Sequence, residues 1–244
     1  MTAITISSFA IIGFAAFIHA SFQLSVSVLT LLSGHSIGKK TAHRKVLRLM
    51  NGFILGAIAG TVMLLSTISY YLSLGITHQT SAERLAASVI CGGMVGLGIA
   101  VWAIYYRRGD STALWLPRGF ASYLTKRSKA TRNAAESFSL GLASLIAELL
   151  FIIGPLFAAS IAIVTLPDVT WRLFGIATYT IIATLPLIVV TLLVGGGHTI
   201  TRLQRWRLSH KRFLQFTASG GLLVLAAFLF VDRAIGIGTY GGLW

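Results

Sequence analysis

Six apolar stretches of the chain are each long enough to cross a lipid bilayer as a helix. They lie near residues 3–32, 49–74, 86–106, 138–165, 174–196 and 213–231. A spanning helix needs about 20 apolar residues to cross about 30 Å of hydrocarbon. Only 11% of the residues are charged, against about a quarter in soluble domains. We therefore expect an all-α integral membrane protein with six transmembrane helices, because runs such as LFIIGPLFAASIAIV lack the strict alternation of a membrane barrel.

The basic residues are confined to one side of these six stretches. Seventeen of the 20 lysines and arginines fall in the segments after the first, third and fifth stretches, and the other three are Arg84, Arg172 and Arg233. The positive-inside rule then places both termini outside a cell membrane, in our interpretation the bacterial inner membrane. The net charge of +14 is explained by topology and by attraction to anionic lipid head groups, and nucleic-acid binding is disfavoured.

The chain divides into two halves that resemble each other. GFAAFIHASFQLSVS aligns with GLASLIAELLFIIGP at an offset of 128 residues, and CGGMVGLGIAVWAI aligns with SGGLLVLAAFLFVD at the same offset. Because three helices is an odd number, the second copy would enter the membrane from the opposite face. We expect an inverted-topology repeat, with chance similarity between apolar helices as the alternative. Its parts are residues 1–106, a basic cytoplasmic linker at 107–137, and residues 138–244.

Two further patterns concern packing. Gly52, Gly56 and Gly60 recur every fourth residue, as do Gly92 and Gly96, which predicts close approach between helices of the chain, with dimerisation as a second use. In the linker, apolar residues precede a basic cluster and predict a short amphipathic helix in the membrane interface. They are Trp115, Leu116, Phe120, Tyr123 and Leu124.

Deep polar groups concentrate in the helices that open each half. In the first, a stripe at the helical period comprises His19, Gln23, Ser27, Thr30 and Gly34, and in the second Ser144 and Glu148 lie one turn apart. A charged carboxylate at this depth costs several kcal/mol unless it is paired or faces water. We expect Glu148 and His19 to approach each other at the midplane. The structural alternative is a protonated Glu148 on a backbone carbonyl and a satisfied core histidine.

Prolines add to this candidate site. Pro155, after Gly154, frees the carbonyl of Phe151, and Pro186 frees that of Ile182. Thr180 and Thr184 share a face and could bond the latter carbonyl. We expect Gly154, Pro155 and Pro186 to act as kinks or gates, and the site as a whole to favour a proton, a cation or a cationic small molecule and to repel an anion.

No signature of an enzyme, metal centre or cofactor is present in the sequence. There are no paired carboxylates, no HExxH and no nucleophile motif. The single cysteine, Cys91, excludes a disulfide framework or a thiol pair. We therefore expect neither catalysis nor a bound cofactor or metal.

The segment FSLGLASLIAELLFIIGPLFAASIAI resembles the second-half helix of the cytochrome c biogenesis transmembrane proteins related to the disulfide reductase DsbD, a family grouped with the LysE-type exporters. The resemblance implies six helices built as two inverted triplets. The redox members carry cysteines where this chain has Ile152 and Leu24, so thiol electron transfer is not implied here. The exporter branch remains.

These observations predict a small secondary transporter, an exporter of a cation or a cationic or amphipathic small molecule. Its substrate or ion site would comprise Glu148, His19, Gln23, Ser27, Ser144, Thr180 and Thr184, with proton or cation coupling. The alternative is a non-catalytic membrane subunit or assembly factor that docks a partner through its basic cytoplasmic face. A homodimer or a larger membrane complex fits either hypothesis.

Overall fold

The computed structural model describes residues 3–22, 24–34, 42–76, 80–105, 118–196 and 209–235. In these ranges the chain is helical apart from short connections such as 131–133 and 165–168, and it contains no strand. The elements are α1 (Ala3–Ser21), α2 (Leu24–Gly34), α3 (Ala42–Ile76), α4 (Thr80–Tyr105), α5 (Arg118–Ala130), α6 (Ala134–Val164), α7 (Val169–Gly195), α9 (Lys211–Leu229) and the π-helical turn η1 (Phe230–Ile235).

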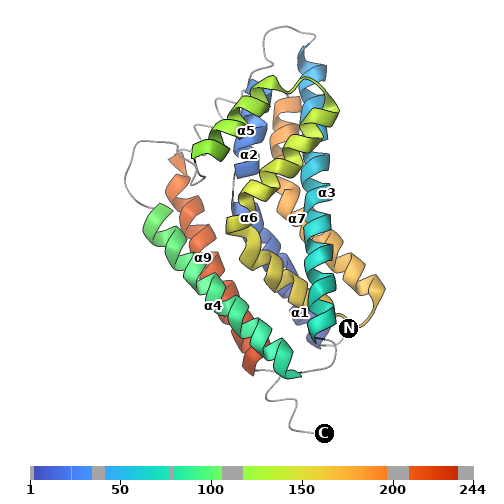
Figure 1. Ribbon diagram of the computed structural model, residues 1–244, viewed down its shortest axis with the longest axis vertical. Coiled ribbons are helices and arrows are strands. Elements are labelled where there is room, and N and C mark those ends of the chain that lie inside the picture. The colour runs from blue at the N-terminus through green and yellow to red at the C-terminus, as the bar shows by residue number, and fades with distance from the viewer. Residues whose placement is uncertain are drawn as a thin grey trace.

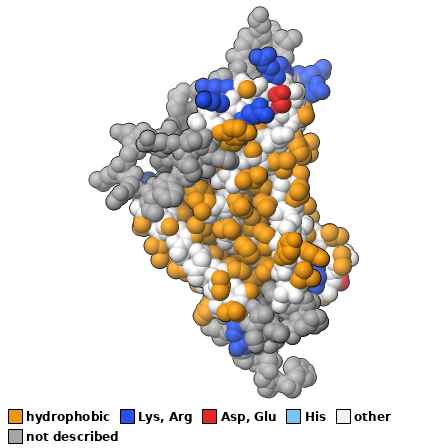
Figure 2. Space-filling model, viewed as in Figure 1, with side chains coloured by type: hydrophobic (Ala, Val, Ile, Leu, Met, Phe, Trp, Pro, Cys, Tyr) orange, Lys and Arg blue, Asp and Glu red, His pale blue; other side chains and the backbone are white. Residues whose placement is uncertain are grey.

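Five of the described helices are long and apolar enough to cross a membrane: α3, α4, α6, α7 and the α9 segment. Large apolar side chains cover the outside of these helices, among them Leu55, Met63 and Leu192, each more than half exposed. Figure 2 shows hydrophobic side chains over the middle of one face, with Lys and Arg at its ends. This pattern suits a multi-pass membrane protein whose outer surface faces lipid.

The first predicted span is not one helix. The expected continuous stretch at 3–32 was wrong in this respect, because α1 ends at Ser21 and α2 begins at Leu24. The backbone N–H of Phe22 bonds the carbonyl of His19, the tight turn typical of a helix end. No proline or glycine marks the break in the sequence, and its stabilising partner comes from another helix.

The helices form a main body and a flanking pair. In the body, α6 and α7 contact each other and each contacts both α1 and α3, and α4 and α9 lie side by side along one flank (Figure 1). Largely apolar clusters fill the interior, one of them built around Ile152, Leu156 and Tyr179. The N-terminal end of α1 and the η1 turn lie at the same end of the molecule in Figure 1. Helix α5 lies at the opposite end.

Glycines set the closest helix pair, α3 with α6. A Cβ atom on Gly52 would lie 2.7 Å from the backbone oxygen of Ala134, and one on Gly56 or Gly141 would overlap backbone atoms of the facing helix. Real Cβ atoms do not come so close, so only glycine permits this spacing. The predicted packing role is confirmed for Gly52, Gly56 and Gly60, since the last also faces leucine side chains of α6.

The same prediction was wrong for Gly92 and Gly96. Both are exposed on the outer side of α4, and a Cβ atom on either would meet nothing within 4 Å. Helix α9, one of the helices that contact α4, packs against its opposite side, where Gly98 approaches Leu223. Four-residue glycine spacing does not by itself say which face of a helix is covered.

The linker contains the predicted short helix, α5. Leu124 is buried, whereas Tyr123 is half exposed, and α5 contacts α2 and α6. Its apolar side therefore covers protein at least in part. Trp115 and Leu116 of the same predicted segment lie outside the described residues.

Candidate functional site

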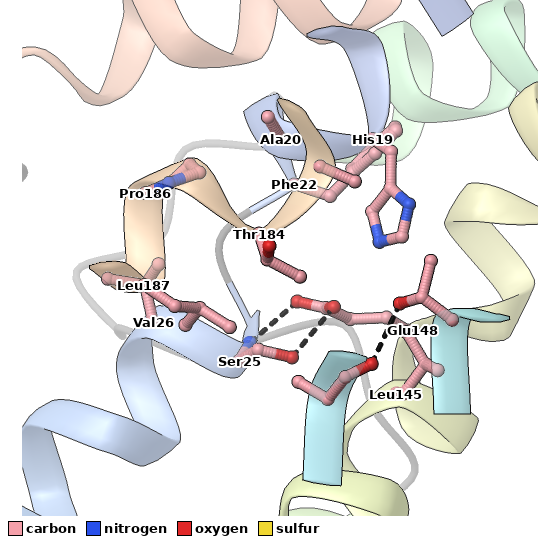
Figure 3. Close-up of a pocket in the computed structure, with 13 residues that line it drawn as sticks. His19, Ala20, Phe22, Ser25, Val26, Leu145, Glu148, Thr184, Pro186 and Leu187 are labelled. Atoms are coloured by element: carbon pink, nitrogen blue, oxygen red, sulfur yellow. Dashed lines mark hydrogen bonds between the residues drawn. The ribbon is translucent and has the colours of Figure 1, made fainter. Parts of the chain in front are cut away.

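A small cavity lies where α1, α2, α3, α6 and α7 meet. Its volume is about 20 Å³, room for about one water molecule. It is lined by His19, Ala20, Phe22, Ser25, Val26, Ala57, Thr61, Leu145, Glu148, Ala183, Thr184, Pro186 and Leu187 (Figure 3). The cavity thus adjoins the break between α1 and α2.

Glu148 is bonded to the first turn of α2. The side chain is 2% exposed. Its Oε1 accepts the backbone N–H of Ser25 at 2.6 Å, and its Oε2 accepts the Ser25 hydroxyl at 2.8 Å. The first N–H groups of a helix have no intrahelical partner and carry a partial positive charge. The carboxylate from α6 therefore acts as an N-cap supplied by another helix.

Ser144, one turn before Glu148, extends this network. Its hydroxyl lies 3.1 Å from the Ser25 hydroxyl and donates to the carbonyl of Gly141 at 2.8 Å. Both serines are buried. The network ties α2 to α6 through buried polar side chains, and hydrogen bonds between polar side chains are a common means of joining membrane helices.

His19, 5% exposed near the end of α1, does not bond Glu148. Its Nδ1 lies 3.0 Å from the hydroxyl of Tyr179 on α7, and the two rings pack with centroids 5.6 Å apart. Both His19 and Glu148 line the cavity. The expected approach of these two side chains is thus observed as a shared cavity and not as a direct hydrogen bond.

Two threonines face the cavity from opposite helices. Thr61 of α3 donates its hydroxyl to the carbonyl of Ala57 at 2.8 Å, and Thr184 of α7 donates to that of Thr180 at 2.8 Å. Their hydrogens are directed back along their own helices. What these hydroxyls can offer the cavity is therefore oxygen lone pairs.

Thr180 and Ser27, two further predicted site residues, are not part of the cavity lining. Thr180 is buried and bonds the carbonyl of Ile176, so neither it nor Thr184 bonds the carbonyl of Ile182 as expected. Ser27 lies on α2, half-buried, and the predicted stripe is interrupted because the helix breaks before it. Gln23 lies outside the described residues.

Helices α6 and α7 run unbroken through Pro155 and Pro186. Both change direction along their length in Figure 1. Pro186 lines the cavity. Gly154 allows α4 to pack closely against α6, because a Cβ atom on Gly154 would lie 2.7 Å from Met94 Cγ. The prolines are placed to bend the helices that carry Glu148 and Thr184.

Sequence reasoning missed Ser25, Thr61 and Tyr179. Ser25 lies off the predicted stripe, and Thr61 follows Gly60 in a helix interpreted only for packing. Tyr179 precedes Thr180 and carried no signal of its own. These three residues come together only because helices that are far apart in the sequence pack against one another. No local sequence pattern predicts that packing.

No group of three or more His, Cys, Asp or Glu side chains that could hold a metal occurs in the described part of the chain. The site instead comprises one carboxylate, one imidazole and hydroxyls around a helix break. Comparison with protein-family models, curated proteins and solved structures found no match to this chain.

Proposed function

We propose that the protein is a small secondary transporter that exports a cation or a cationic small molecule and binds its coupling ion beside Glu148 and His19. The observation that carries this proposal is the broken first span whose inner N-terminus is capped by Glu148. Several transporter folds build their substrate and ion sites from discontinuous helices near the membrane midplane, with half-helix N-termini directed at anionic groups, and here that anionic group is the carboxyl of Glu148.

The pattern of helix contacts supports an inverted repeat. In such a repeat, α1 together with α2 would correspond to α6, α3 would correspond to α7, and α4 would correspond to α9. The contact of α3 with α6 would then be equivalent to that of α7 with α1, and the contact of α4 with α6 to that of α9 with α1. All four contacts occur, as does that of α4 with α9, which corresponds to itself. In this proposal the six spans comprise α1 with α2 as one, and both termini lie outside.

The size of the cavity favours an ion in the observed state. Room for about one water suffices for a proton carrier or a small cation, whereas an organic substrate requires the site to open. Bending at Pro155 and Pro186 would allow the second half to move against the first, as alternating access requires.

The test is transport by purified protein in liposomes that contain a pH-sensitive dye. Na⁺, K⁺, ammonium, lysine and tetraphenylphosphonium are applied in turn, and internal pH is followed. We expect at least one of them to drive a pH change in wild type that Glu148→Gln abolishes. Glutamine is nearly isosteric and can still accept from Ser25, so the variant should fold.

Glu136→Gln is the matched control. Glu136 lies in the first turn of the same helix, exposed, where it accepts the backbone N–H of Arg132 at 2.8 Å. Transport in this variant should equal wild type. Wild-type flux in Glu148→Gln would refute the proposal, and a stoichiometric copurifying partner with no flux would favour the subunit alternative.

A further inference from the structure

The proton on His19 can be located from its partner. The contact with His19 Nδ1 is the one hydrogen bond that the Tyr179 hydroxyl makes among the described residues. Tyr179 is fully buried, and a buried hydroxyl places its hydrogen on an available acceptor. Donation from Tyr179 to Nδ1 satisfies this hydroxyl, whereas the opposite direction would leave its hydrogen without an acceptor among the described residues. A neutral imidazole whose Nδ1 accepts carries its hydrogen on Nε2.

That second nitrogen faces the cavity. Figure 3 shows one ring nitrogen of His19 directed to the side where Glu148 and Thr184 lie, and no hydrogen bond to Nε2 occurs within the described ranges. The cavity thus receives one N–H donor from α1. It faces the Glu148 carboxylate and the lone pairs of Thr61 and Thr184.

We propose that the cavity holds one water molecule, which accepts from His19 Nε2–H and donates to Glu148, and that this arrangement selects a proton over an alkali metal ion as the coupling ion. This inference rests on the proposed function, because only a transporter has a coupling ion. A water with two to four polar partners in a space of this size is stable. A metal ion would face the positive end of an N–H dipole at short range.

Both protonation states of Glu148 are satisfied by the same lining. As a carboxylate it accepts from Ser25 and from the water. When it takes up a proton from solvent through this water, the new O–H can donate to the water or to a threonine oxygen, and no other group changes protonation. Tyr179 acts as a positioning residue, because it fixes the nitrogen of His19 that faces the site.

The titratable groups around the cavity are few. Glu148 comes from α6 and His19 from α1, while α2, α3 and α7 line the cavity with Ser25, Thr61 and Thr184 and other uncharged residues. Tyr179 of α7 contacts His19. Among the described residues, Glu148 and His19 are the titratable side chains that line the cavity. Because the imidazole is neutral in the proposed arrangement, Glu148 is the group that takes up the proton.

The first test is nitrogen NMR of histidine-labelled protein in liposomes, with His19 assigned by its loss in His19→Gln. We expect Nε2 to be protonated and Nδ1 to show the shift of a hydrogen-bond acceptor. In Tyr179→Phe that acceptor shift should disappear, whereas Tyr71→Phe, an exposed tyrosine on α3, should leave it unchanged. Protonation of Nδ1 in wild type would overturn the inference even if Tyr179→Phe does not fold.

The second test is an infrared pH titration of the Glu148 carboxyl band, identified by its absence in Glu148→Gln. The midpoint should be the same in sodium chloride and in N-methylglucamine chloride. A midpoint that moves with sodium concentration would mean competition between the two ions and would overturn the selectivity for protons. Because neither test needs flux, failure of the transport proposal remains distinguishable from failure of this one.

Discussion

Gly56→Ala tests the helix pair that places Glu148. A methyl group at this position would overlap the backbone of Phe138 on α6, and no rotamer change can move a backbone oxygen. Overpacking of this kind costs about 1–3 kcal/mol, and we take the upper end because backbone opposes it. Replacing glycine by alanine inside a helix returns about 1 kcal/mol. The net destabilisation should be about 2 kcal/mol.

Thermal unfolding in detergent measures this effect, with Gly92→Ala as the matched control. Gly92 is a helix-interior glycine with nothing within 4 Å of its would-be Cβ, so the propensity gain of about 1 kcal/mol is unopposed. At about 2–4 °C per kcal/mol, Gly56→Ala should lower the melting temperature by about 4–8 °C and Gly92→Ala should raise it by about 2–4 °C. Equal shifts in the two variants would refute the α3–α6 packing described above.

Two further predictions concern the cavity. Ser25→Ala removes the hydroxyl bonded to Oε2 of Glu148 and should lower the free energy of unfolding by about 1.5–3 kcal/mol if the carboxylate is charged. Ser73→Ala is the control, because the Ser73 hydroxyl bonds a carbonyl of its own helix. An effect of Ser25→Ala no larger than that of the control would contradict the prediction. In a Cys91→Ala background, Thr184→Cys should react with a small water-soluble thiol reagent if water reaches the cavity, while the buried native Cys91, bonded to Ala226, should stay unlabelled in wild type.

Much of the fold follows from hydropathy, because lipid forces backbone polar groups into helices whatever the side chains are. Apart from the first, the apolar stretches became helices whose ends lie within seven residues of their predicted limits, the largest differences being the earlier starts of α3 and α4. The role of Gly52 and Gly56 also followed from their spacing. Gly92 and Gly96 have the same spacing but a different environment, so the pattern predicts that a helix can approach and not that one does.

The candidate site could be predicted only in part. Glu148 and His19 stood out because ionisable groups are rare inside apolar stretches long enough to span a membrane. Ser25 did not, since a serine in an apolar helix is ordinarily satisfied by a carbonyl one turn back. Because α1 ends at Ser21, the backbone N–H of Ser25 bonds Glu148 and not a carbonyl of its own helix. This makes Ser25 part of the site. The contact between α2 and α6, which are far apart in the sequence, determines the role of Ser25. No residue near position 25 predicts that contact.

The helix break and Glu148 stabilise each other. A half-helix that begins inside the membrane exposes up to about four unpaired N–H groups, and each costs several kcal/mol in hydrocarbon. Glu148 offsets part of that cost, and the helix end in turn offsets the cost of a buried charge. If α2 moved away from α6 during transport, the carboxylate would lose both Ser25 donors and would need a proton in their place. In the proposed transporter, separation of these two helices is thereby linked to ion uptake at Glu148, which is the coupling that a secondary transporter requires.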